Sequence, residues 1–376
     1  MKKICFISTF AYPLFNKSSK IIHGGAEIDL FFIAEELANH ENFEVFFVTA
    51  DFGQPNPEKF NKIVVYSSWK VNLTGCLKYL YSFFGLFKFI KALKSTKSEI
   101  FVQEAAGIET LIVSLFCRLT KKKFVYRVSS TVECDGKIIQ LHPFMGRLFL
   151  LGLRLADAIV TEDQEEVDLL KQKYNLKAQA IYDTTPLPNI KLLIPVEQRR
   201  HIIWVGRLVK IKRPDIFLDL VTNLPYEKFI IIAATVDSND EYTKKIIVQA
   251  KTLKNTVLIP GLKYYELDEF YRYSKLLINT SDFEGYPNTF IEAGKYGVPI
   301  ITLNVDPDKL LSLNNFGECA RGNINILIDT VSTWLKNIKK REVAGQAFRE
   351  YVEKTNDIHK NIQDYISLFD RLSMPK

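Results

Sequence analysis

The sequence predicts an α/β protein with two Rossmann-like parallel-sheet domains that face each other across a cleft. The first observation is the length, since 376 residues suit two domains of ordinary size. The second is the alternation of short, continuously apolar runs with stretches of helical period, which is typical of strands buried on both faces of a parallel sheet. The third is a proline-rich interruption, after which the alternation starts again.

The first series of alternations predicts an N-terminal domain over residues 1–183. Helical patterns separate its strands, notably over 26–40 and 107–119. We interpret the opening residues as a first buried strand rather than a signal peptide, because Ser8 and Thr9 break the apolar run and no small-residue cleavage site follows. The predicted strands are 4–9, 43–50, 62–67, 99–104, 123–129 and 157–162.

Prolines at 186, 188 and 195 predict a hinge over 184–200. A second series then predicts a C-terminal domain over 201–345, and ligands of open parallel sheets bind at the carboxyl ends of the strands. A final helical stretch runs from about Ile324 to Leu372 with a predicted break near Gly345, and we expect residues 346–376 to pack back toward the N-terminal domain. The predicted strands of the second series are 201–206, 229–235, 256–261, 275–281 and 298–303.

Composition limits the classes of partner. The chain is 47% hydrophobic, with a net charge of +7, which favours an anionic ligand or membrane surface and does not require nucleic acid. Its 5 cysteines are widely spaced and form no CxxC, so we expect free thiols and a cytoplasmic protein. No run has the roughly 20 apolar residues that span a bilayer.

The stretch WVGRLVKIKRPDIFL (204–218) predicts a strand, a glycine turn and a helix. Gly206 ends the strand, and Arg207 and Lys212 follow it. Arg suits bidentate recognition of a phosphate, and Lys supplies a compact charge. The alternative is that both are solvated surface charges.

The stretch SDFEGYPNTFIEAGKYGVPII (281–301) repeats this geometry and carries two carboxylates, Glu284 in a loop and Glu292 inside a predicted helix. Asn288 or Thr289 is expected to cap that helix, whose free N–H groups suit a diphosphate. A carboxylate accepts hydrogen bonds from vicinal hydroxyls, so the pair suits a sugar and a ribose. Alternatively, Glu292 only favours the helix dipole and Glu284 is a surface charge.

Four stretches together resemble a known family. EGYPNTFIEAGKYGVPII resembles the E-x7-E signature of retaining, nucleotide-sugar-dependent glycosyltransferases of family four, which have the GT-B fold. VGRLVKIKRP is similar to the phosphate motif of that family, and HGGAE (23–27) to its N-terminal glycine loop. Residues 156–174 are similar to the segment that closes its first domain, so the resemblance covers most of the chain.

The resemblance implies a role for each motif. Arg207 and Lys212 would hold the donor diphosphate and stabilise its charge on leaving, and Glu284 would bind hydroxyls of the transferred sugar; these are the implied catalytic residues. Glu292 would bind the ribose. The implied donor-binding residues are Gly24, Gly25, Gly206, Leu262, Gly285, Tyr286, Pro287, Asn288, Thr289 and Glu292.

The implied reaction moves a hexose-type sugar, with retention, from a UDP- or GDP-sugar to a hydroxyl of a glycan or lipid-linked acceptor. It suits cell-surface polysaccharide or lipopolysaccharide assembly, with the N-terminal domain holding the acceptor. Neither a cofactor nor a metal is expected. Asp306-Pro307-Asp308 follows a strand outside the motif set and is interpreted as a surface turn.

The chain departs from the family at the end of the strand YRVSSTVECDG (126–136), which lacks a histidine common in relatives. The substitutes considered are Ser129, Ser130, Glu133 and Asp135, with His23 as a further candidate. Two other functions stay open. A nucleotide-sugar epimerase would need no acceptor, and a non-catalytic nucleotide-sugar-binding subunit would not turn over.

Residues 76–94, CLKYLYSFFGLFKFIKALK, are rich in Phe, Leu and Lys. Such a segment is able to lie on an anionic membrane, on the inner face of the cell membrane, as a peripheral contact. The alternative is a buried helix of the first domain, because the apolar residues surround most of the helix and Gly85 interrupts it.

Overall fold

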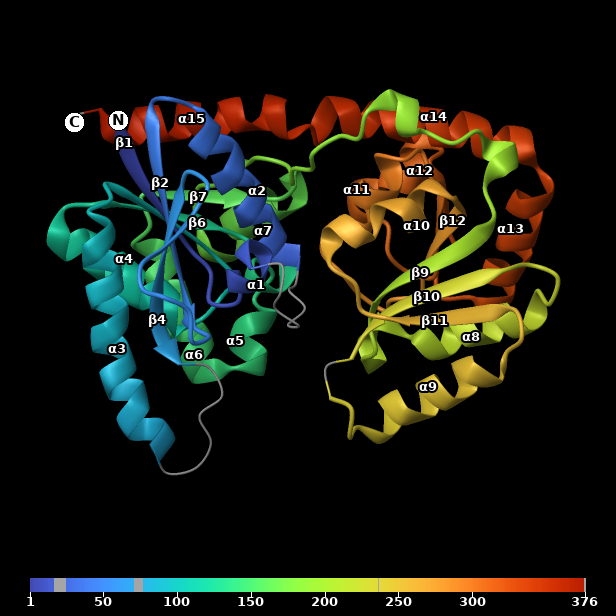
Figure 1. The fold of residues 1–376 in the computed structure, drawn as a ribbon, viewed down its shortest axis with the longest axis horizontal. Helices are drawn as coiled ribbons and strands as arrows, with labels where there is room; N and C mark the ends of the chain where they lie inside the picture. The colour runs from blue at the N-terminus through green and yellow to red at the C-terminus, as the bar shows by residue number, and fades with distance from the viewer. Residues whose placement is uncertain (17–24, 71–76, 236, 375–376) are drawn as a thin grey trace. The chain divides into compact units, whose positions relative to one another are not determined.

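The computed structural model describes residues 1–376 except 17–24, 71–76, 236 and 375–376, and it describes no side chains over 77–83. The chain divides into two compact units, which are considered separately (Figure 1). The first is Met1–Pro186 with Ile358–Lys376, and the second is Leu187–Asp357. The sequence placed its boundaries at 183/184, 200/201 and 345/346.

The first unit contains an eight-stranded sheet in the order β3-β4-β2-β1-β5-β6-β7-β8. Every neighbouring pair is parallel except β3 with β4. All of β5 is buried, and its apolar residues 100–102 suit a strand whose two faces are covered by helices. The strands are β1 Lys2–Ile7, β2 Phe43–Asp51, β3 Glu58–Phe60, β4 Ile63–Lys70, β5 Ile100–Glu104, β6 Lys123–Arg127, β7 Ala158–Thr161 and β8 Gln179–Ala180.

Helices follow the strands of the first unit. Aromatic side chains from α3, α4 and α6 join those of β5 and β6 in one core, centred on Phe89, Phe101, Phe116, Phe124 and Phe149. The helical segments are α1 Tyr12–Phe15, α2 Gly25–Asn39, α3 Leu77–Thr96, α4 Ile108–Thr120, η1 Thr131–Glu133, α5 Lys137–Leu141, α6 Pro143–Arg154, α7 Gln164–Tyr174 and α15 Ile358–Ser373. Within the described parts of the chain, no helix is long and apolar enough to cross a bilayer.

The second unit contains a six-stranded, fully parallel sheet in the order β11-β10-β9-β12-β13-β14. Separate cores lie on its two faces, one around Trp204 and Phe217 and the other around Phe290 and Phe348. The strands are β9 His201–Arg207, β10 Phe229–Ala234, β11 Thr256–Pro260, β12 Ser274–Asn279, β13 Ile300–Thr302 and β14 Gly317–Cys319. Both sheets therefore confirm the predicted α/β fold with two parallel-sheet domains.

The helical segments of the second unit connect these strands. They are η2 Ile190–Leu192, η3 Val196–Gln198, η4 Lys210–Lys212, α8 Pro214–Asn223, α9 Glu241–Thr252, η5 Tyr264–Glu266, α10 Asp268–Arg272, α11 Asn288–Gly294, η6 Pro307–Lys309, α12 Leu310–Asn314, α13 Ile324–Lys336 and α14 Ile338–Thr355. The turn at 306–308 stabilises the start of α12, because the Asp306 carboxylate accepts a 2.7 Å hydrogen bond from the backbone N–H of Leu311 in that helix.

The predicted helix break near Gly345 is wrong. The breaks fall at Asn337, which caps α14 through the N–H of Lys340, and at 356–357 before α15. Gly345 lies inside α14, and a Cβ there would sit 2.2 Å from the carbonyl oxygen of Gly297. The glycine is thus required by a close backbone contact and does not end the helix.

The described cysteines at 5, 117, 134 and 319 are free thiols, as the sequence predicted, and Cys76 lies outside the described residues. Burial raises the pKa of the Cys5 and Cys117 thiols, so neither is a reactive thiolate.

Candidate functional site

The two motifs of the second unit meet at the carboxyl ends of β9 and β12, which are neighbours in the sheet. Thr280 joins them, because its hydroxyl donates to the carbonyl of Lys212 at 2.8 Å and accepts from the Trp204 indole at 3.0 Å. The N–H of Asp282 donates to the carbonyl of Ile211 at 2.9 Å. The turn after β9 and the loop after β12 are therefore one hydrogen-bonded structure.

Within this structure Lys212 and Glu284 form an ion pair. The other carboxylate oxygen of Glu284 accepts from the Asn279 amide at 2.7 Å and from the Ser281 hydroxyl at 2.5 Å. The exposed fractions of the side chains are 20% for Lys212 and 13% for Glu284. The pair is thus fixed in direction but reachable from solvent, and an anion binding Lys212 must share that ammonium with Glu284.

Arg207 stands at the last position of β9 and is exposed. Among the residues that the structure describes, no hydrogen bond or ion pair holds its guanidinium, which leaves its donors available to a ligand. A Cβ at the preceding Gly206 would lie 3.0 Å from the Trp204 ring, so the ring would have to shift to admit a side chain.

A further ion-pair bridge links the same two loops. Arg213 pairs with Asp215 at 3.0 Å and with Asp282 at 3.3 Å. The hydrogen bonds that Arg213 donates to Asp215 raise the pKa of Arg213, so the guanidinium stays charged. Sequence reasoning missed Arg213, because its partner Asp282 lies on the other loop. It also missed Asn279 and Ser281, which contact Glu284 within their own loop.

The helix that carries Glu292 begins one residue earlier than expected. Pro287 occupies the N-cap of α11, so Asn288 and Thr289 lie inside the helix and do not cap it. The fixed φ of proline places the start at the next residue. The predicted cap is therefore wrong, although the helix itself was correctly predicted.

Glu292 contacts a lysine that the sequence did not single out. The Lys295 ammonium lies 2.6 Å from Glu292 and 3.1 Å from Asp268, and its side chain is 4% exposed. Burial lowers the pKa of Lys295, but the two carboxylates outweigh it and raise the pKa above its ordinary value. The signal was present in the sequence as an i, i+3 pair on one helix face.

Two buried arginines hold the carboxyl end of α11. Arg199 donates to the carbonyls of Gly297 at 2.7 Å and Tyr296 at 2.9 Å, and Arg349 donates to the carbonyl of Lys295. Burial lowers the pKa of Arg199 to about 10. These contacts place Glu292 on a rigid support, which favours a binding role.

The remaining donor-binding candidates occupy different environments. Tyr286 is 8% exposed and packs in the core with Phe290. Leu262 follows β11 and packs against the same core. Gly285 is half-buried in the loop. Gly25 opens α2 in the first unit, whereas Gly24 and His23 lie outside the described residues.

The residues considered as substitutes for the missing histidine all make local contacts in this fold. Glu133 is buried and accepts hydrogen bonds from the Tyr126 hydroxyl at 2.9 Å and the Ser129 hydroxyl at 2.7 Å. Burial raises the pKa of Glu133. Ser130 caps η1 through the N–H of Val132. Asp135 forms an ion pair with Lys137 at 2.7 Å.

The first unit contains a buried charge cluster that no sequence pattern predicted. Arg127 is fully buried and pairs with Glu104 at 3.3 Å, Glu162 at 3.4 Å and Asp183, while its Nε donates to the Tyr365 hydroxyl. In the described parts of the chain, Asp29, Glu104 and Glu162 are the carboxylates close enough to share a cation. The Arg127 guanidinium already supplies positive charge there.

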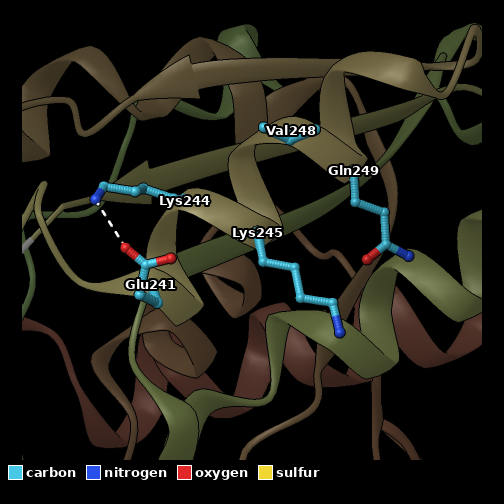
Figure 2. Close-up of a pocket in the computed structure, with 5 residues that line it drawn as sticks. All are labelled: Glu241, Lys244, Lys245, Val248 and Gln249. Carbon is cyan, nitrogen blue, oxygen red and sulfur yellow. Dashed lines mark hydrogen bonds and ion pairs between the residues drawn. The ribbon is translucent and has the colours of Figure 1, made fainter.

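The surface of α9 carries a shallow depression lined by Glu241, Lys244, Lys245, Val248 and Gln249 (Figure 2). Lys244 pairs with Glu241 at 2.9 Å across one turn of the helix. All five side chains come from one helix, and none belongs to the motifs. We therefore assign this depression to the ordinary surface of α9.

Comparison with known proteins agrees with these motifs. Residues 191–351 match the family model of glycosyl transferases group 1. The chain is 23% identical over 289 residues to the amylovoran biosynthesis glycosyltransferase AmsD of Erwinia amylovora, covering 75% of this chain and 77% of the relative.

Solved structures extend the likeness to both units. Sucrose-phosphate synthase from Thermosynechococcus elongatus has a TM-score of 0.78 at 16% identity, covering 99% of each chain. TarM of S. aureus, solved with UDP, has a TM-score of 0.74 at 12% identity, covering 98% of this chain and 100% of that one. Residues 191–351 are thus similar to glycosyl transferases group 1, and the two parallel-sheet units match structures of the GT-B type fold.

Proposed function

We propose that the protein is a retaining glycosyltransferase that moves a hexose-type sugar from a nucleotide-diphosphate sugar to a hydroxyl of a glycan or lipid-linked acceptor. The observation that carries the proposal is the Lys212–Glu284 pair, fixed at the carboxyl ends of β9 and β12 beside the exposed Arg207. This edge of a parallel sheet is where such folds bind ligands.

Electrostatics supports a role for the two cations. Breaking a sugar–phosphate bond leaves negative charge on the departing diphosphate, and positive side chains fixed beside it stabilise that charge. Arg207 offers a planar set of donors and Lys212 a compact ammonium. Two such cations supply the countercharge, and the proposal requires no metal and no cofactor.

The carboxylates suit hydroxyl recognition. Glu284 is proposed to accept hydrogen bonds from the transferred sugar, and Glu292 from the ribose. The backbone of 285–289 and the side chain of Leu262 would line the rest of the donor site. The acceptor hydroxyl would attack the face from which the diphosphate leaves, and a diphosphate oxygen would take its proton.

The setting is proposed from the relatives. A relative that acts in amylovoran biosynthesis supports a place in polysaccharide assembly for this chain. The solved neighbour that holds UDP supports UDP as the first nucleotide to test.

The first test is thermal stabilisation of the full chain by UDP, GDP, ADP and CMP, with and without EDTA. A ligand that binds only the folded state raises stability with the logarithm of its concentration over Kd. One nucleotide should raise Tm whether or not EDTA is present, and Lys244→Ala on α9 should behave like wild type.

Turnover then separates the alternatives. A transferase requires an acceptor, an epimerase does not, and a non-catalytic subunit binds nucleotide without turnover. No Tm shift with any of the four nucleotides would contradict the donor site itself.

A further inference from the structure

Exposed apolar side chains are concentrated on two packed helices of the first unit, α4 and α6. Leu119 on α4 is 84% exposed and Phe144 on α6 is 73% exposed, and Leu115 and Leu151 are exposed on the same helices. Burying such side chains is favourable, so a group of them on one surface marks a contact site.

The two helices present these residues on their outward sides. On α6, Phe144, Arg147, Leu151 and Arg154 follow helical spacing and are exposed, whereas Phe149 and Leu153 point into the core. On α4, Leu115, Arg118 and Leu119 are exposed, whereas Val113 and Phe116 are buried.

The helices lie unusually close together. A Cβ at Gly152 of α6 would sit 2.7 Å from the backbone N of Leu111 in α4, and a Cβ at Gly146 would sit 2.7 Å from the carbonyl oxygen of Ile138 in α5. Backbones in such contact form a firm platform, so its exposed side chains are displayed together.

The charge of this platform is predominantly positive. Residues 108–123 and 137–154 contain one acidic residue, Glu109, against seven basic ones: Arg118, Lys121, Lys122, Lys123, Lys137, Arg147 and Arg154. A hollow beside this surface is lined by Arg118, Lys121–Lys123, Leu155 and Asp157. Asp157 pairs with Lys123 at 3.1 Å, and the other three cations leave the hollow net positive. Cations among large apolar side chains complement a surface that is anionic above and apolar below.

We propose that the outward face of α4 and α6 docks on an anionic lipid surface. Leu119, Phe144 and Leu151 would enter the boundary between headgroups and acyl chains, and the arginines would contact lipid phosphates. This docking is independent of the proposed glycosyl transfer. Only the purpose of the docking, which is to reach a lipid-linked acceptor, depends on that proposed function. The sequence had placed membrane contact at 76–94 instead, in α3.

The experiment measures binding of the full chain to vesicles by co-sedimentation, with phosphatidylcholine alone or with phosphatidylglycerol added. Two variants test the surface, Leu119→Ser with Phe144→Ser, and Arg147→Gln with Arg154→Gln. Their matched controls lie on the second unit: Tyr226→Ser with Val248→Ser, at positions 98% and 64% exposed, and Lys244→Gln with Lys245→Gln.

Wild type should bind phosphatidylglycerol vesicles, bind neutral ones weakly, and lose binding as salt rises. Each cation near an anionic surface strengthens binding roughly fivefold, so the arginine variant should bind about 25-fold more weakly. The apolar variant should also bind more weakly, and both control variants should bind like wild type.

Absence of wild-type binding to anionic vesicles at low salt would overturn the proposal, as would equal losses in the control variants. A dimer that only the Leu119/Phe144 variant dissociates would show instead an interface between copies. The nucleotide Tm shift is measured in parallel. If wild type binds vesicles but shows no Tm shift with any nucleotide, the proposed glycosyl transfer is contradicted and the docking is not. If wild type shows the Tm shift but does not bind vesicles, only the docking is contradicted.

Discussion

At the scale of single residues, Lys212 and Glu284 neutralise each other before any ligand arrives. From the sequence we predicted both residues in one site, with Lys212 on the diphosphate and Glu284 on the transferred sugar. Their pairing was not predictable, because it depends on how the turn after β9 docks on the loop after β12. Asn279 and Ser281 were missed for a different reason, because short polar side chains are common in any loop.

We expect Glu284→Gln to lower kcat about 100-fold or more while leaving nucleotide diphosphate affinity unchanged or tighter. The reason is that the amide removes the charge that competes for Lys212, yet it no longer accepts strongly from the reacting sugar. Steady-state kinetics and calorimetry with the nucleotide measure the two effects. Unchanged kcat would remove Glu284 from the chemistry.

Arg207→Ala should weaken nucleotide diphosphate binding by about 1.5–3 kcal/mol, the range for a hydrogen bond to a charged group. Stability should change little, because the side chain is exposed. Calorimetry and thermal melts measure these, with Lys244→Ala as the control. Equal affinity of wild type and variant would exclude Arg207 from the site.

Lys295→Met should destabilise the fold by about 3 kcal/mol, toward the lower end for a broken buried pair because Asp268 is half exposed. The pKa of Lys295 is raised in the fold, so its contribution is complete below about pH 10.4 and is lost as pH rises through the folded value. Urea unfolding at about pH 8 and pH 11 measures both effects. A variant as stable as wild type at pH 8 would contradict this role.

At the scale of helices and strands, burial made most elements predictable. The eleven predicted strands all exist, because each is a continuous apolar run between turns. The missed strands β3, β8 and β14 have two or three residues and lie at sheet edges, too short to show a pattern. The break at Gly345 was mispredicted because the partner of that glycine lies 48 residues away in sequence.

Gly345→Ala should destabilise the protein by about 1–3 kcal/mol, as overpacking does, although alanine normally favours a helix. The new methyl group would meet the Gly297 carbonyl at 2.2 Å. Gln346→Ala, on the exposed side of α14, is the control and should be neutral or slightly stabilising. Chemical denaturation measures both, and a stabilised Gly345→Ala protein would contradict the contact.

At the scale of the whole molecule, stability should depend on buried carboxyls of the first unit. Burial and the charge of Asp163 raise the pKa of Glu166 to about 9. The folded state then holds a proton that the unfolded chain has released, so the free energy of unfolding falls as pH rises from about 4.3 to 9, by up to about 1.4 kcal/mol per unit.

Glu166→Gln should reduce this slope, because an amide does not titrate. Exposed Glu165→Gln is its neighbour on α7 and should keep the wild-type slope. Urea unfolding at a series of pH values measures the slopes. Identical slopes in all three proteins would show that Glu166 is ionised in the fold.

The two-domain α/β architecture was predictable for the whole chain, since it follows from the alternation of apolar strands and helices. The buried Arg127 cluster was not, because its members come from six separate segments and no periodicity connects them. A motif can be recognised when its residues are neighbours in sequence. A cluster that only folding brings together cannot be recognised from the sequence.

The contact between Gly297 and Gly345 also constrains how this chain can evolve. A side chain at either position would strike the backbone of the other, at 2.9 Å from one side and 2.2 Å from the other. A substitution at either position can therefore be accepted only if α14 also shifts. Among descendants of this sequence, the two glycines should be inherited as a linked pair.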